Sequence, residues 1–146
     1  MTILAALEQA TQAIGAPYFL LPIAGRDHPI KRERVYCYEL FHQLRLALRD
    51  SQLILTGEPD KRGHPDFPSI NPDFILHTPG GHEENTAAVE VECRVGLEHL
   101  IKDLRNLKAM RERGYGTLVL LLFANNDVPW PKLAQAAREA DIGLGE

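Results

Sequence analysis

Hydrophobic residues recur at helical spacing in several stretches of the chain, separated by glycines and prolines. In residues 2–14 they form one apolar face, which Gly15 and Pro17 then end. Residues 32–50 carry the clearest pattern of this kind, with a broad apolar face. We therefore predict helices in these two stretches, and two further helices in residues 97–113 and 131–140.

Shorter apolar stretches between these helices have the length of strands. Residues 74–78 and 87–94 flank a glycine-containing turn, which favours an antiparallel pair. Residues 117–123 are continuously apolar, which is typical of a strand covered on both faces. Residues 52–55 are a candidate for a short strand, and residues 57–71, which contain several prolines, are expected to form a loop. This order predicts an α/β fold in which helices flank a mixed sheet.

The composition indicates a globular protein without a membrane segment, but it does not indicate a function. The 146 residues fit one domain, and 45% hydrophobic and 25% charged residues are ordinary for a globular protein. No apolar run approaches the roughly 20 residues that span a bilayer, so we expect no membrane segment. The start of the chain lacks the pattern of a secretory signal. We interpret Cys37 and Cys93 as reduced core thiols and expect a cytoplasmic protein.

Three carboxylates on the predicted strands suggest chemistry. Asp73 begins one strand, and Glu90 and Glu92 lie on the next. Side chains alternate along a strand, so Glu90 and Glu92 share one face while Val89 and Val91 face the core. The hairpin would bring Asp73 beside Glu90 or Glu92. Carboxylates in apolar strands need a partner or a metal, and hard oxygen ligands suit Mg²⁺ or Mn²⁺. Such an ion would favour phosphodiester hydrolysis.

Each of these residues also has an ordinary structural explanation. Asp73 follows a proline and could be a turn residue. Glu90 and Glu92 could face solvent on an edge strand, where charge prevents aggregation. Glu39 could pair with a neighbouring basic residue, and Lys102 could be a solvated helix lysine. All of these residues occur together in one particular order along the chain. That order favours a functional site over separate structural roles.

That joint order resembles the PD-(D/E)XK nuclease superfamily, whose fold is that of restriction endonucleases. Pro72-Asp73 matches the PD element, and Glu90-Val91-Glu92 lies where (D/E)-X-K is expected. Residues 38–45 resemble the first helix of that family, and residues 102–107 resemble the helix after the motif. The resemblance spans residues 35–123 or so. It implies an αβββαβ core in residues 31–146, with residues 1–30 as an N-terminal helix and loop extension.

The resemblance also implies roles for individual residues. Asp73 and Glu90 would hold the metal together with the backbone carbonyl of Val91, and Glu39 would support the ion directly or through water. Glu92 departs from the family pattern, because a lysine is usual at its position. Glu92 would act as a general base or as the ligand of a second metal. Lys102 would supply the missing positive charge, with Arg94 as the alternative.

The expected partner is nucleic acid, with DNA as the first candidate. The net charge of −4 does not itself indicate nucleic-acid binding. Most basic runs are solvated helix faces, yet some could follow a phosphate backbone. The resemblance also allows a homodimer that cuts both strands, and an association with bacterial defence. The alternative is a catalytically inactive, nuclease-like binding or assembly module. The candidate phosphate-binding residues are Arg45, Lys61, Arg62, Arg94 and Arg105.

Overall fold

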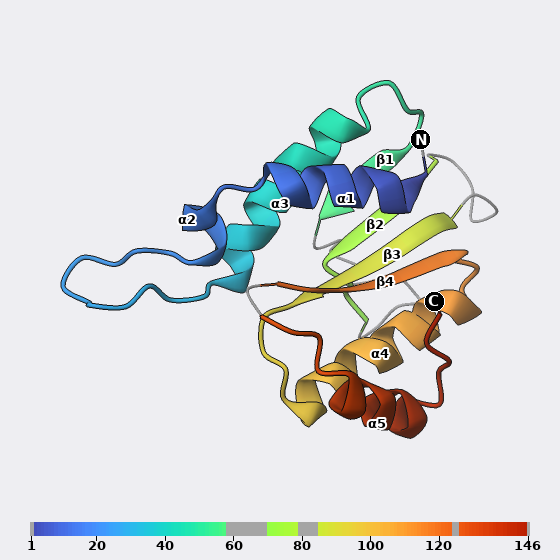
Figure 1. The fold of residues 1–146 in the computed structure, drawn as a ribbon. Helices are drawn as coiled ribbons and strands as arrows, with labels where there is room; N and C mark the ends of the chain where they lie inside the picture. Colours follow the sequence, from blue (N-terminus) through green and yellow to red (C-terminus); the bar gives the residue numbers. More distant parts are fainter. Residues whose placement is uncertain (1, 58–69, 79–84, 124–125, 146) are drawn as a thin grey trace. The chain divides into compact units, whose positions relative to one another are not determined.

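The chain divides into two compact units, Met1–Leu53 and Ile54–Glu146, which are described separately (Figure 1). The division falls inside the segment for which a single nuclease-like core was predicted. The computed structural model describes residues 2–57, 70–78, 85–123 and 126–145.

The first unit is helical. It contains α1 (Ile3–Ala13), α2 (Ala16–Phe19) and α3 (Glu33–Ala47), and both α1 and α2 contact α3. Thr2 begins α1, because its Oγ accepts a hydrogen bond from the backbone N–H of Ala5 at 3.2 Å. The two helices predicted in this part of the chain are confirmed, with ends shifted by one to three residues. The short α2 was not predicted.

The second unit is built on a mixed sheet of four strands in the order β1-β2-β3-β4. Strand β2 pairs antiparallel with β1 on one side and with β3 on the other, and β4 runs parallel to β3 after a crossover through α4. The α/β class and the mixed sheet are therefore confirmed. The elements of this unit are β1 (Ile54–Gly57), β2 (Phe74–His77), β3 (Asn85–Glu92), α4 (Leu97–Glu112), β4 (Thr117–Leu122) and α5 (Trp130–Ala140).

Helix α4 joins the sheet to α5 through its apolar face. Leu100, Leu104 and Leu107 are buried and belong to a hydrophobic cluster that includes Ala88 of β3 and Ala136 of α5. Figure 1 accordingly shows α4 and α5 on the same side of the sheet. The helix ends before Gly114, whose φ of 90° is a conformation that glycine adopts without strain. The packing of α4 fixes which side chains of β3 it covers.

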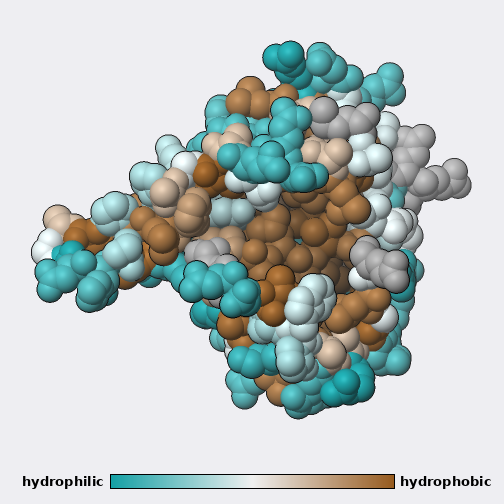
Figure 2. Space-filling model, viewed as in Figure 1, coloured by the Kyte–Doolittle hydropathy of each residue, from teal (hydrophilic) through white to brown (hydrophobic). Residues whose placement is uncertain are grey.

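The strands predicted from the sequence agree in position with those of the structure, except at the start of β1. The observed β2, β3 and β4 overlap their predicted ranges, whereas β1 begins two residues later than expected. The expectation of full burial for residues 117–123 is wrong for β4, whose residues are only half-buried. In Figure 2 apolar surface lies along the course that β4 takes in Figure 1. Strand β4 is the last in the sheet, and no described strand pairs with its outer edge.

No helix in the described part of the chain is both long enough and apolar enough to cross a membrane. The predicted turn at residues 79–84 and most of the predicted loop at residues 57–71 lie outside the described residues.

Candidate metal centre

The acidic face of β3 lies beneath α4. Ala88 packs in the cluster with α4, and alternation along the strand places Glu90 and Glu92 on the same face. Both carboxylates are buried, with 4% and 3% of their residues' surface exposed. Strand β3 lies between β2 and β4, so the alternative of two solvent-facing glutamates on an edge strand is wrong. The opposite face of β3 is also buried, with Val89 and Val91 hidden from solvent as expected.

Glu90 is held in place from the helix above it. The Nδ2 of Asn106 in α4 donates a hydrogen bond to Glu90 Oε1 at 3.0 Å. Burial raises the pKa of Glu90 to about 9, and the negative charges of Asp73 and Asp103 add to this effect. The hydrogen bond from Asn106 and the charge of Lys102 oppose the shift. In the metal-free protein this carboxyl group therefore carries a proton at neutral pH.

Asp73 reaches the same region from the neighbouring strand. Phe74 pairs with Val89, so Val91 lies beyond the paired part of β2. Asp73 lies just before β2, and its Oδ2 accepts a hydrogen bond from the backbone N–H of Val91 at 2.7 Å. The carboxylate thus extends the pairing of β2 with β3 by one contact. This arrangement confirms the expected placement of Asp73 next to Glu90.

Asp103 is the acidic residue that sequence reasoning missed. It lies on α4 with only 4% of its surface exposed, and no described group donates a hydrogen bond to its Oδ2. The Nζ of Lys102 is 3.9 Å from its Oδ1. Burial raises the pKa of Asp103 to about 6, and the charges of Glu92 and Asp73 also act in this direction, whereas Lys102 and Arg94 oppose it. Its signal in the sequence is a carboxylate on the apolar face of a helix.

Glu92 has a different environment from Glu90. Its Oε1 accepts hydrogen bonds from the backbone N–H groups of Cys93 at 2.8 Å and Arg94 at 2.6 Å. The Nε of Arg94 is a third donor at 3.3 Å. The other oxygen, Oε2, lies 3.7 Å from Nδ1 of His99. Glu92 therefore caps the end of β3, and the side chains of Arg94 and His99 lie next to its carboxylate.

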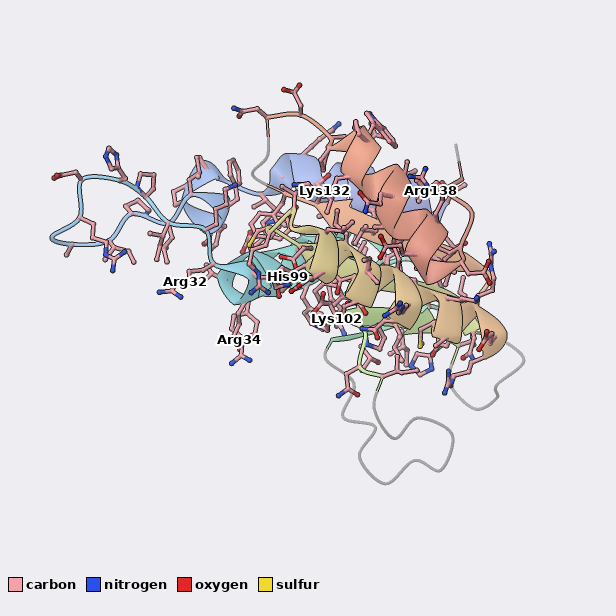
Figure 3. All side chains as sticks on the ribbon, turned by 90° about the horizontal axis from the view of Figure 1, so that it is seen from below. Arg32, Arg34, His99, Lys102, Lys132 and Arg138 are labelled. Atoms are coloured by element: carbon pink, nitrogen blue, oxygen red, sulfur yellow. The ribbon has the colours of Figure 1, made fainter. Side chains whose placement is uncertain are left out.

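Basic side chains surround the buried acids. The side chain of Lys102 is 72% exposed, that of Arg94 is 61% exposed, and that of His99 is 38% exposed. Figure 3 labels His99 and Lys102 on α4. Arg105 is also exposed on α4. An acidic interior with an exposed basic rim can hold a cation inside and attract an anion from solvent.

The structure does not place four of the predicted site residues relative to this group. Glu39 and Arg45 lie on α3 in the first unit, where Glu39 Oε1 accepts a hydrogen bond from Nε2 of Gln43 at 2.7 Å. Lys61 and Arg62 lie outside the described residues. The roles assigned to these four residues stay predictions.

The fit of a divalent ion can be judged from the donor atoms. Asp73, Glu90, Glu92 and Asp103 offer hard oxygen ligands, and the second oxygen of Asp103 has no hydrogen-bond donor among the described groups. Within the described residues, no three of these four carboxylates bring ligand oxygens within 4.8 Å of one another. A cation would attract these carboxylates and displace the proton of Glu90. The chemistry of the donors suits an ion, and binding it requires the side chains to draw together.

The chain matches no family model, no curated protein and no solved structure. The arrangement of the described side chains therefore carries the functional interpretation.

Proposed function

We propose that this protein is a metal-dependent nuclease that hydrolyses phosphodiester bonds, with DNA as the expected substrate. The observation that carries the proposal is the acidic group between α4 and the sheet, in which Glu90 and Asp103 are buried and Asp73 is half-buried. The order α3-β1-β2-β3-α4-β4 supports it, because the PD-(D/E)XK resemblance implies an αβββαβ core. The antiparallel pairs β1–β2 and β2–β3 and the parallel pair β3–β4 agree with the mixed sheet that the resemblance implies.

Energetics favour a metal over a purely structural role for these acids. Burying one unpaired carboxylate is costly, and here several lie close enough to raise one another's pKa. Replacing such groups by neutral ones of similar shape would cost the fold little. Buried carboxyl groups that make the metal-free fold less stable are expected at functional sites, such as one that binds a metal. A divalent ion would offset the negative charge.

Asp73 and Glu90 would hold the ion, which is Mg²⁺ or Mn²⁺ by the hardness of its oxygen ligands. The N–H and C=O of an extended residue point to the same neighbouring strand. Since the N–H of Val91 points to Asp73, its carbonyl lies on that side of β3 too. This agrees with the predicted role of the Val91 carbonyl as a ligand. When bound, the ion would polarise a phosphoryl oxygen and lower the pKa of a water molecule.

Residues of the protein would position and stabilise the substrate. Asn106 orients Glu90 through its hydrogen bond. Lys102 stands on the rim beside Asp103 and is exposed enough to reach a phosphate oxygen. It would supply the positive charge that the family places at the position of Glu92. Arg94 and Arg105 would contact the phosphate backbone, as proposed from the sequence.

The position of Glu92 favours a second candidate function, a nuclease-like module that binds nucleic acid without cutting it. The capping hydrogen bonds to the N–H groups of Cys93 and Arg94 account for Glu92 without any catalytic role. A base role would have to use Oε2, the oxygen that faces His99. The two candidates differ in whether cleavage occurs, whereas both permit phosphate binding by the basic rim.

Cleavage of supercoiled plasmid and of single-stranded DNA in Mg²⁺ or Mn²⁺ tests the proposal. We expect wild-type protein to cut, Glu90→Gln and Asp73→Asn to lose activity by at least about a hundredfold, and Lys102→Ala to lose activity while still binding metal. Glu98→Gln, an exposed change in the first turn of α4, is the matched control. Equal cleavage by wild type and Glu90→Gln would refute the assigned site. DNA binding without cleavage would favour the inactive module.

A further inference from the structure

We propose that Asp103 is the third protein carboxylate of the divalent-metal site, in the role that the sequence resemblance gave to Glu39. The inference rests on the metal site of the proposed function and adds a ligand from α4.

The position of Asp103 follows from its neighbours along α4. Near the start of the helix, His99 faces Glu92, with 3.7 Å between His99 Nδ1 and Glu92 Oε2. Further along, Asn106 reaches Glu90 at 3.0 Å. Asp103 lies between these two contacts on the helix, and it is buried like the core leucines of the same face. It therefore stands above the part of β3 that carries both glutamates.

The helix and the sheet approach this region from two sides. Asp103 is on the side of α4 that contacts Glu90 and Glu92, and it extends from the helix towards the acidic face of β3. Glu90 extends from the sheet, and Asp73 lies beside it just before β2.

The burial of Asp103 is what points to a ligand. Buried carboxylate oxygens normally accept hydrogen bonds, yet Oδ2 of Asp103 has no donor among the described groups. Lys102 is 3.9 Å from the other oxygen and largely exposed, so it compensates the charge poorly. A divalent ion between Asp103, Glu90 and Asp73 would satisfy this oxygen.

Titration of the metal-free protein with Mn²⁺ alone, followed by calorimetry, tests the inference without any nuclease assay. We expect Asp103→Asn to weaken Mn²⁺ binding by at least about tenfold, and we expect the same of Asp73→Asn. Glu39→Gln should bind like wild type. Asp127→Asn, an exposed aspartate in the same unit, is the matched control and should also bind like wild type.

The outcomes separate this inference from the proposed function. If Asp103→Asn binds Mn²⁺ like wild type while Asp73→Asn does not, Asp103 is no ligand and the metal site itself stands. If Glu39→Gln weakens binding and Asp103→Asn does not, the family assignment holds instead. If wild-type protein binds no Mn²⁺ at millimolar concentrations, both the inference and the proposed metal site are refuted.

Unfolding in the presence of a chelator provides the second measurement. Asp103→Asn and Asp103→Leu should melt at the same temperature as wild type or higher, because each removes a buried charge that the exposed Lys102 offsets only weakly. A clear fall in melting temperature for both variants would overturn the inference, since the carboxylate would then stabilise the fold by itself.

Discussion

Glu90 combines a buried position with neighbours of its own charge. The side chain is fixed by Asn106, so it cannot turn towards solvent without losing that hydrogen bond. Its pKa of about 9 means that the folded chain binds a proton that the unfolded chain releases near pH 4.5. The ionisation of this one group therefore links the stability of the metal-free protein to pH.

The sign of the dependence follows from the raised pKa. The stabilising contribution of protonated Glu90 is complete below about pH 4.5 and is lost as the pH rises towards 9. Urea unfolding in a chelator should therefore give a lower free energy of unfolding at pH 8 than at pH 5. Glu90→Gln should reduce this difference and stabilise the protein at pH 8 by about 1–3 kcal/mol.

Glu98→Gln is the control for this experiment, because Glu98 is exposed on the same helix as Asn106. The interpretation of Glu90 would be wrong if Glu90→Gln lowered stability at pH 8, or if wild type and variant showed the same pH dependence.

Helix α4 serves two purposes within the second unit. Its leucines fill the layer between the sheet and α5, while Asp103 and Asn106 face the acidic residues of β3. The leucines therefore set the height and rotation of the helix above Glu90. Packing defects in α4 are expected to disturb the site as well as the core.

Leu104→Ala tests this coupling. Leu104 is 3% exposed, so its truncation should leave a cavity and lower the free energy of unfolding by about 2–5 kcal/mol. Chemical denaturation measures this loss, and Mn²⁺ affinity should fall with it. Arg105→Ala, the exposed neighbour, should change stability by no more than about 0.5 kcal/mol. A loss of similar size in both variants would contradict the packing described for α4.

The sequence predicted the elements better than it predicted the contacts of the site. Periodic apolar residues placed α3, α4 and β3 within a few residues, because burial of one face determines the pattern. Asp103 escaped notice because a charged residue in a helix is usually solvated. The capping role of Glu92 depends on the path of the chain after Cys93, which no local pattern encodes. The half-buried state of β4 depends on its place at the end of the sheet.

The net charge of the chain is not a measure of its surface charge, because some of the acidic residues are buried. The net charge of −4 includes the buried acids, so part of it lies in the interior and not on the surface that meets a substrate. A divalent ion adds two positive charges, and Glu90 would release its proton on binding, so the net negative charge would fall by about one. Folding and metal binding are then linked, because only the folded chain brings these acids together.

Thermal unfolding in a chelator and in excess Mg²⁺ measures this linkage. A ligand at a hundred times its dissociation constant stabilises a folded protein by about 2.7 kcal/mol. For a chain of this size such a gain raises the melting temperature by several degrees. Asp73→Asn should abolish the rise. An equal rise in Asp73→Asn and wild type would show that Mg²⁺ acts elsewhere on the protein.

The burial of Asp103 also determines how the gene would respond to directed evolution. In a screen for heat resistance carried out in a chelator, leucine or asparagine at position 103 would be enriched, because the core-facing position suits an uncharged side chain. The same variants would be depleted in a screen for a metal-requiring activity. Substitutions at position 103 would then be enriched in one screen and depleted in the other, whereas substitutions of Asp127 would be neutral in both. That result would show that Asp103 is retained for metal binding and not for stability of the fold.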